Sequence, residues 1–334
     1  MEDKVVVNEE ICKLVAERLI PLCFRKEHFQ RLFLNFPSDK ETKLRAFLFP
    51  VAICHQTHIL HSKKLNLWGW EYLEHVYTNL GKYYSQLIDP KYLANLSKEE
   101  LIEKLKPLFS DDGNPENCTL DRLEERAEFI IEISKYLNEN YDGKIENLLI
   151  KSNGHLFNKE NGIYELMEHL PAFADSQRKK STVFIKFVID ANLFEVNDQQ
   201  NIIPIMDYHM QRALLRIGCV EVLDDELKEA LLTKKTLNSD KEVRDASVKA
   251  IIKIGEFANK TPSEVHDFFW PLGRSCCKEK MLCVDKQCNK EPCTFFNFVE
   301  IPEHNHCIFE GICKGNTNET YREFWQPIVD THYY

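Results

Sequence analysis

Apolar side chains recur at helical spacing along most of this chain. Between residues 119 and 140, Leu123, Ala127, Ile130 and Leu137 fall on one face of a helix, while glutamates occupy the other face. The same spacing predicts helices near 8–22, 43–60, 69–87, 97–107, 119–140, 160–170, 178–194, 205–217, 223–233, 240–258 and 262–275. Strand signals are confined to short pieces at 5–7 and 295–301. The pattern therefore predicts an all-α fold.

Three of these helices begin with an expected capping box, in which serine or threonine is followed three residues later by glutamate. The pairs are Ser97 with Glu100, Ser239 with Glu242, and Thr261 with Glu264.

The chain is poor in glycine, with 11 among 334 residues, and no two glycines lie closer in sequence than Gly311 and Gly315. Neither a G-x-G-x-x-G fingerprint nor a Walker phosphate-binding loop can therefore be written. A net charge of -10 argues against a chain coated with nucleic acid, although it permits a local basic groove. The sequence shows no basic leader and no apolar run of membrane-spanning length, so we expect a cytoplasmic protein with no membrane partner.

Cysteine is unevenly distributed, because seven of the 12 cysteines follow residue 275. The earlier cysteines are scattered singly, as in proteins of a reducing compartment, so the later cluster predicts metal ligands. Helical spacing also stops at this point. We therefore expect a helical body at 1–275 and a cysteine-rich, metal-supported tail at 276–334.

An aspartate opens the helix expected at 205–217. Asp207 follows an Ile-Pro entry, and an acid in this place is ordinarily a helix cap. The pattern D-x-H-x-x-R, which includes His209 and Arg212, resembles the catalytic-aspartate segment of the helix-hairpin-helix (HhH-GPD) superfamily of base-excision DNA glycosylases. This resemblance implies a two-lobed helical fold with a catalytic segment at 203–217.

A segment at about 165–195 resembles the hairpin of the same superfamily. Leu170-Pro171 introduces a turn, and Lys180-Ser181 begins the next helix, where these enzymes carry a lysine. The long, glycine-poor hairpin is similar to that of the archaeal 8-oxoguanine DNA glycosylases. The resemblance implies a catalytic role for Lys180, with Lys186 as the alternative, while a solvated basic helix start would also explain these residues.

An aspartate and a lysine suit the cleavage of an N-glycosidic bond. Breaking this bond builds positive charge on the sugar, which a carboxylate such as that of Asp207 stabilises. A lysine can attack the sugar and form a Schiff base if burial or neighbouring cations, here Arg178 and Lys179, lower its pKa. A glycosylase with both groups would also be able to cut the DNA strand.

The start of the cysteine cluster resembles the iron-sulfur entry of the endonuclease-three and adenine-glycosylase branches, because Gly273-Arg274 precedes a cysteine by a few residues. The resemblance implies a [4Fe-4S] cluster, or zinc as the alternative, although the cysteine spacing departs from that of those branches. The ligands would be Cys276, Cys283, Cys288 and Cys293, with Cys307, Cys313, His304 and His306 as alternatives. Disulfides or free thiols are the other explanation.

Further residues are expected to contact DNA that contains a modified base. The segment Cys54-His55-Gln56-Thr57-His58 resembles an early glycosylase helix in which a Gln-Thr pair lies near the extruded base, so we expect Gln56 to read that base. The other base-binding candidates are Trp68, Trp70, Trp270 and His209, and the backbone-binding candidates are Arg178, Lys179, Arg212 and Arg274. Tryptophans in such a chain are more often part of the hydrophobic core.

Roughly half of the chain also resembles the queuosine-salvage nucleotide glycohydrolases. The segments that carry this resemblance are Asp89 to Leu93, Arg122 to Arg126, Leu170 to Asp175, Asp207-Tyr208 and Ser239 to Ala246. That family hydrolyses a nucleotide, with an aspartate at the place of Asp207 and a lysine nearer to Lys186. The chain departs from it where Asn-Phe-Cys-Phe-Trp is replaced by Cys54 to His58, and where the arginine after Asp-Tyr is His209, so queuosine itself is a disfavoured substrate.

We therefore expect a monomeric DNA N-glycosylase that flips out and excises an oxidised or hypermodified base, such as phage DNA carries. Basic stripes near 178–186 and 274–290 favour a DNA backbone over a mononucleotide. The alternatives are a nucleotide N-glycohydrolase of the queuosine-salvage type and a relative that binds DNA without catalysis.

Overall fold

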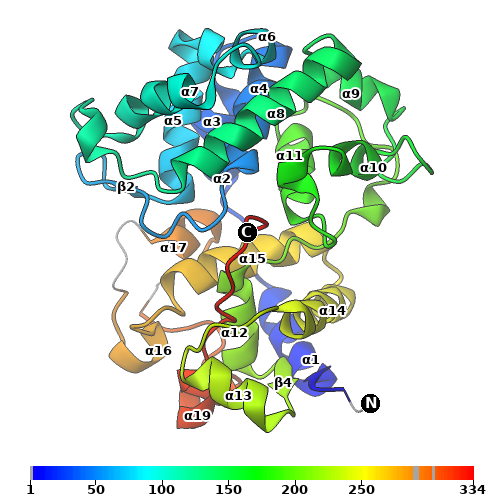
Figure 1. Ribbon diagram of the computed structural model, residues 1–334. Helices are drawn as coiled ribbons and strands as arrows, with labels where there is room; N and C mark the ends of the chain where they lie inside the picture. Colours follow the sequence, from blue (N-terminus) through cyan, green and yellow to red (C-terminus); the bar gives the residue numbers. More distant parts are fainter. Residues whose placement is uncertain (1–2, 289–292, 303–304) are drawn as a thin grey trace. The chain divides into compact units, whose positions relative to one another are not determined.

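The computed structural model describes residues 3–288, 293–302 and 305–334. Its contacts form two compact units, and most of their helices are labelled in Figure 1. Unit 1 comprises Met1–His28 and Pro204–Asp330, and unit 2 comprises Phe29–Ile203 and Thr331–Tyr334. The expected boundary after residue 275 does not separate these units. Cys276, Cys293 and Phe295 are buried in the same hydrophobic core as the helices that precede them.

Unit 1 is organised by four helices, since α12 packs on both α14 and α15, and α1 packs on α14. Its two short strands pair antiparallel, with Val6 opposite Glu221. The elements are β1 (Val5–Val7), α1 (Glu9–Leu19), α2 (Lys26–Phe29), α12 (Tyr208–Ile217), β4 (Val220–Val222), α13 (Asp225–Leu232), α14 (Lys241–Ala258), α15 (Pro262–Ser275), α16 (Leu282–Asp285), α17 (Thr294–Phe298), α18 (Lys314–Thr317) and α19 (Glu319–Glu323).

Unit 2 surrounds helix α4, in which every residue from Ala46 to Ala52 is buried. A helical segment that is apolar on all sides must lie inside a domain, and α5, α8, α9 and α11 pack against α4. The elements are α3 (Leu32–Asn35), α4 (Lys40–Ala52), β2 (His61–Ser62), β3 (Leu67–Trp68), α5 (Trp70–Tyr83), α6 (Pro90–Leu93), α7 (Lys98–Leu105), α8 (Leu123–Tyr141), α9 (Ile145–Lys151), α10 (Ile163–Glu168) and α11 (Lys179–Asp190), with short 3-10 turns between them.

The helical class expected from the sequence is confirmed, because every helix predicted from the spacing is present in some form. The helix expected at 43–60 ends at Ala52, and the residues after it turn sharply at Gln56, whose φ is 47°. The strand expected at 295–301 is wrong, since this segment forms α17, with only Val299 bridging to Phe24. Among the described residues, no helix combines the length and the apolar character needed to cross a membrane.

Two of the three expected capping boxes are formed. Ser97 and Thr261 each accept a hydrogen bond from the backbone N–H three residues ahead, and the glutamate there accepts one in return. At α14 the N-cap is Asp240, and Ser239 accepts a hydrogen bond from the Lys241 N–H instead, at 3.1 Å. The third box is therefore wrong, because the chain turns one residue later than expected.

Replacing the hydroxyl groups of Thr261 and Ser239 tests whether only the first of them caps a helix. We expect Thr261→Ala to lower the free energy of unfolding by about 1 kcal/mol, because an orphan helix N–H loses its acceptor. Ser239→Ala should cost less than half as much. Urea unfolding of both variants measures this, and equal losses would contradict the assignment.

Candidate active site

Asp207 caps helix α12 in unit 1. Its backbone is extended (φ -122°, ψ 174°), and its Oδ1 accepts a hydrogen bond from the Met210 N–H at 3.1 Å. The side chain is almost buried, with 6% exposed. The helix N-terminus therefore holds this carboxylate in one orientation, as the reaction expected from the sequence requires.

Arg212 lies one turn further along α12 and fastens this helix to the end of α15. Its Nη2 donates to the Gly273 carbonyl at 2.7 Å, its Nε donates to the Cys277 carbonyl at 2.9 Å, and Nη2 lies 3.2 Å from the His209 Nδ1. Glycine is needed at 273, because a Cβ there would lie 2.4 Å from the His209 carbonyl oxygen. Arg212 is 2% exposed, so these contacts engage it within unit 1, and the expected contact with a DNA phosphate stays a prediction.

Lys180 is fully buried in unit 2. Its Nζ donates to the Ala52 carbonyl at 2.5 Å and lies 3.4 Å from the His55 Nδ1 and 5.6 Å from the centre of the Phe129 ring. Burial, followed by the charges of neighbouring cations, lowers the pKa of Lys180 to about 7. The amine thus meets the electronic requirement for a nucleophile, but a substrate cannot reach it unless the residues that cover it move.

His55 connects Lys180 to a carboxylate that the sequence did not single out. The His55 Nε2 lies 3.2 Å from Oε2 of Glu125, and burial together with the charge of Lys180 strongly lowers the pKa of His55. The neutral imidazole must then donate from Nε2 to Glu125 and accept at Nδ1 from Lys180. Glu125 lies on α8, four residues before Phe129. It belongs to the segment 122–126, which resembles the nucleotide glycohydrolases, and this resemblance was the signal in the sequence that could have identified it.

Gln56 is tied into the same network. Arg122 donates from Nη1 to the Gln56 Oε1 at 2.7 Å and from Nε to Glu125 at 2.7 Å. Both Gln56 and Arg122 adopt left-handed backbone conformations, with φ of 47° and 49°, which costs a non-glycine residue about 1 kcal/mol. The amide oxygen that was expected to read a base therefore already has an intramolecular donor.

The segment Thr331–Tyr334 belongs to unit 2 and lies against this network. The His332 ring centre is 5.1 Å from that of Phe129, and its Nδ1 is 3.8 Å from Glu125. The Gln56 N–H donates to the Tyr334 carbonyl at 3.3 Å. Sequence reasoning missed His332, which carries no local motif.

Lys186 lies elsewhere on α11, beside an aromatic stack. Its Nζ forms an ion pair with Asp190 at 2.9 Å and lies 5.7 Å from the centre of the Phe29 ring. The Trp70 and Phe187 rings stack at 5.4 Å with an interplanar angle of 15°. Unlike Lys180, the Lys186 side chain is partly exposed, at 11%.

The other expected nucleic-acid contacts have partners inside the protein. Arg178 pairs with Glu165 at 3.3 Å and with Glu168 at 2.5 Å, and the Lys179 Nζ lies 3.8 Å from the Cys54 sulfur. The Trp68 ring stacks on His61 at 4.9 Å, Trp270 packs against Phe298 at 5.7 Å, and Arg274 lies over Trp270 at 4.9 Å. The Trp68 side chain is 45% exposed.

Three of the four cysteines expected to hold a metal come together in unit 1. The Cys293 sulfur is hydrogen-bonded to the thiols of Cys276 and Cys288, whereas Cys283 lies near Cys277 instead. All the cysteines are free thiols. In the described part of the chain, no three His, Cys, Asp or Glu side chains are arranged to hold a metal ion. The expected [4Fe-4S] cluster or zinc ion stays a prediction. His304 lies outside the described residues.

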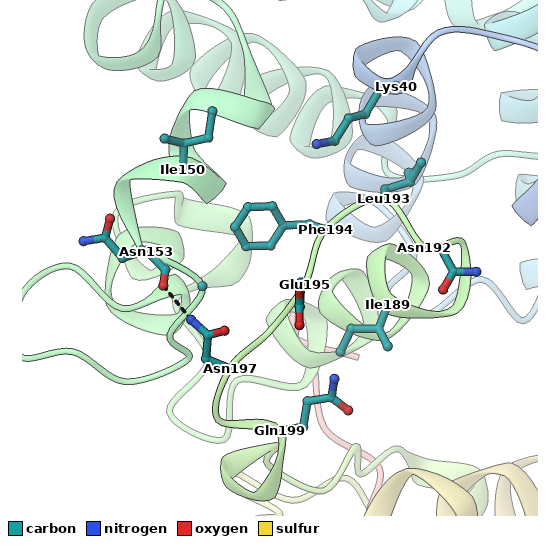
Figure 2. A pocket seen from close by; sticks show the side chains of 11 residues that line it. Lys40, Ile150, Asn153, Ile189, Asn192, Leu193, Phe194, Glu195, Asn197 and Gln199 are labelled. Atoms are coloured by element: carbon teal, nitrogen blue, oxygen red, sulfur yellow. Dashed lines mark hydrogen bonds between the residues drawn. The ribbon is translucent and has the colours of Figure 1, made fainter.

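A separate open pocket of about 740 Å³ lies in unit 2 (Figure 2). Phe194 stands in it with the Lys40 Nζ 5.9 Å from its ring centre, and the Asn197 side chain donates to the Asn153 carbonyl at 2.9 Å. None of the residues expected to bind or react lines this pocket. It is therefore not the candidate active site.

A family model described as queuosine salvage protein matches residues 69–272, which is more than half of the chain. No curated protein matches the chain. The matched span includes Asp207, Lys180 and Lys186 and excludes the cysteine-rich tail. The match supports the expected alternative, a nucleotide N-glycohydrolase, better than the expected DNA glycosylase.

Buried Lys180 should make stability depend on pH. The pKa of its amine is about 7 in the folded protein and near 10.5 when unfolded. Below pH 7 the charged amine is buried, which destabilises the folded state. Between pH 7 and pH 10.5 the unfolded state binds a proton that the folded state lacks. The contribution of Lys180 to the free energy of unfolding therefore rises with pH in this range. The stability of Lys180→Met relative to the wild type should therefore be higher at pH 7 than at pH 9.5, while the loss of the hydrogen bond to the Ala52 carbonyl lowers it at both pH values.

The difference should be a few kcal/mol at most, since one pKa unit corresponds to about 1.4 kcal/mol. Urea unfolding at both pH values measures it, with Lys64→Met as an exposed control that should show no such change. If the stability of Lys180→Met relative to the wild type were the same at both pH values, the lowered pKa of Lys180 would be contradicted.

Proposed function

Since the chain belongs to the queuosine salvage protein family, we propose that it is an N-glycohydrolase that separates the base of a modified nucleotide from its sugar. The observation that carries this proposal is the family match over residues 69–272, within which Asp207 lies. The fixed, nearly buried carboxylate of Asp207 supports it further.

Asp207 is the proposed catalytic carboxylate. When the bond between C1′ and the base nitrogen breaks, positive charge develops on the sugar, and a carboxylate already held in place stabilises that charge without reorganising. Water supplies a hydroxyl group to C1′ and a proton to the departing base. The products are a free base and a sugar phosphate.

Within unit 2, Lys186 is the basic residue that we propose for the reaction, in preference to Lys180. The amine of Lys180 is fully buried and bonded to the Ala52 carbonyl, whereas the Lys186 side chain keeps some exposure. The position of Lys186 is also the one that the resemblance to the nucleotide glycohydrolases implies. An ammonium group there suits an anionic nucleotide.

The proposed base differs from that of queuosine. The segment 54–58 departs from the family pattern, and two of its side chains, His55 and Gln56, are held by Glu125 and Arg122. A DNA substrate has weaker support, because Arg178 and Arg212, which would grip its backbone, are engaged within the protein.

The carboxylate can be tested against a matched helix cap. Asp224 caps α13 in the same way, accepting from the Leu227 N–H at 2.8 Å. We expect Asp207→Asn to lower kcat at least 100-fold, a loss typical of a group that stabilises the transition state, while the asparagine still caps the helix. Asp224→Asn should change kcat less than twofold.

The assay measures release of free base by mass spectrometry. The substrates are modified nucleoside 5′-monophosphates, including that of queuosine, and duplex DNA with oxidised or alkylated bases. Release from DNA with no turnover of any nucleotide would overturn the proposal, as would full activity of Asp207→Asn.

A further inference from the structure

The open pocket of unit 2 in Figure 2 takes no part in the proposed reaction, since none of the residues proposed for that reaction lines it. Its volume of about 740 Å³ is enough for a nucleobase together with its ribose. Ile150 in the last turn of α9 and Ile189 in the last turn of α11 belong to its lining. The pocket therefore lies where two helices end.

Hydrogen bonds between the segments that follow α9 and α11 fix one wall of this pocket. The Asn197 N–H donates to the Gly154 carbonyl at 2.7 Å, and the Asn197 side chain donates to the Asn153 carbonyl at 2.9 Å. The next residue, Asp198, is 8% exposed and accepts from the Leu156 N–H at 2.7 Å. A ligand would meet a pocket that is already formed, which reduces the loss of conformational entropy on binding.

Phe194 provides an aromatic surface in the pocket. Its ring stands among the lining side chains in Figure 2 and is partly exposed, with the Lys40 Nζ 5.9 Å from its centre. Ile150, which is 56% exposed, adds an aliphatic surface. A partly exposed ring beside aliphatic side chains is a surface on which a planar heterocycle can stack.

The lining is also rich in carboxamide groups, which belong to Asn153, Asn192, Asn197 and Gln199. A carboxamide offers donors and an acceptor together, and this combination pairs with the edge of a purine base. Asn192 has a left-handed backbone with a φ of 52°, so glycine can replace it without strain. The carboxamide can thus be removed while the turn is kept.

The charges of the pocket disfavour a phosphate group. Among the described lining residues Lys40 is the one base, and its Nζ is already paired with Glu146 at 2.8 Å. Glu195 adds a negative charge to the lining. The ends of α9 and α11 add to this, because the C-terminus of a helix carries partial negative charge. An uncharged ligand is therefore favoured over a nucleotide.

We propose that this pocket is a ligand site, separate from the proposed active site, that binds an uncharged purine base or its nucleoside. The purine ring stacks on Phe194, and the carboxamides of Asn192 and Asn197 bond to its edge. The ribose of a nucleoside takes up the remaining volume. The proposal goes beyond the proposed function, because it concerns binding without any reaction.

The test titrates the full-length protein with adenine, adenosine or adenosine 5′-monophosphate at pH 7 and follows hydrogen exchange of residues 192–197. This segment reports on the pocket itself, because the N–H groups of Asn192, Leu193 and Asn197 are hydrogen-bonded. We expect adenine and adenosine to slow this exchange. The monophosphate should bind at least threefold more weakly than adenosine, because its phosphate meets like charge.

Three variants and a control separate the contributions of the ring, the carboxamide and the charge. Phe194→Leu keeps an apolar side chain but loses the ring, so adenosine should bind about tenfold more weakly. Asn192→Gly should weaken adenosine at least threefold. Glu195→Gln should tighten the monophosphate at least twofold and change adenosine less than twofold. Phe257→Ala, at a 40% exposed phenylalanine of α14, should behave as the wild type.

Several results would overturn the proposal. These are no slowing of exchange in residues 192–197 by millimolar adenine or adenosine, tighter binding of the monophosphate than of adenosine, and unchanged adenosine affinity in Asn192→Gly and Phe194→Leu. Far-ultraviolet circular dichroism shows whether each variant is folded, and Asn192→Gly decides the matter if Phe194→Leu is not. No measurement needs turnover, so failure of the proposed function is distinguishable from failure of this site.

Discussion

Both units depend on buried cations that hydrogen-bond the carbonyl groups where helices end. A helix leaves its last carbonyls without partners, and burying them unpaired costs free energy. In unit 2, Lys180 bonds the Ala52 carbonyl at the end of α4, and Arg126 bonds the carbonyls of Ile53 and His55 just beyond it. The chain can therefore leave α4 inside the core and turn towards the residues of the candidate site.

Unit 1 repeats this solution at the end of α15. Arg212 bonds the carbonyls of Gly273 and Cys277, and Arg216 bonds those of Cys277 and Phe324. Both arginines lie on α12, the helix that Asp207 caps, so the position of this carboxylate is tied to the start of the cysteine-rich segment.

These contacts explain why the DNA interpretation arose from the sequence and why the structure does not support it. A run such as Arg178-Lys179-Lys180 has the composition of a phosphate-binding stripe. Whether a cation faces solvent depends on partners far away in the sequence, here Glu165 for Arg178 and Ala52 for Lys180. The motif around Asp207 was shared by both resemblances and could not separate them, whereas the family match extends over most of the helical chain.

The sequence alone determined what depends on neighbours a few residues apart. Helical spacing placed the helices, and Ser97, Thr261 and Asp207 act as caps because a cap needs only the next turn of its own helix. The tertiary structure alone decided which cations are buried and which ring nitrogen of His55 carries the hydrogen. It also decided that Cys293 meets Cys276 rather than Cys283. Each of these depends on contacts between residues on different elements, where only the packing of the whole unit determines the burial that sets charge and reactivity.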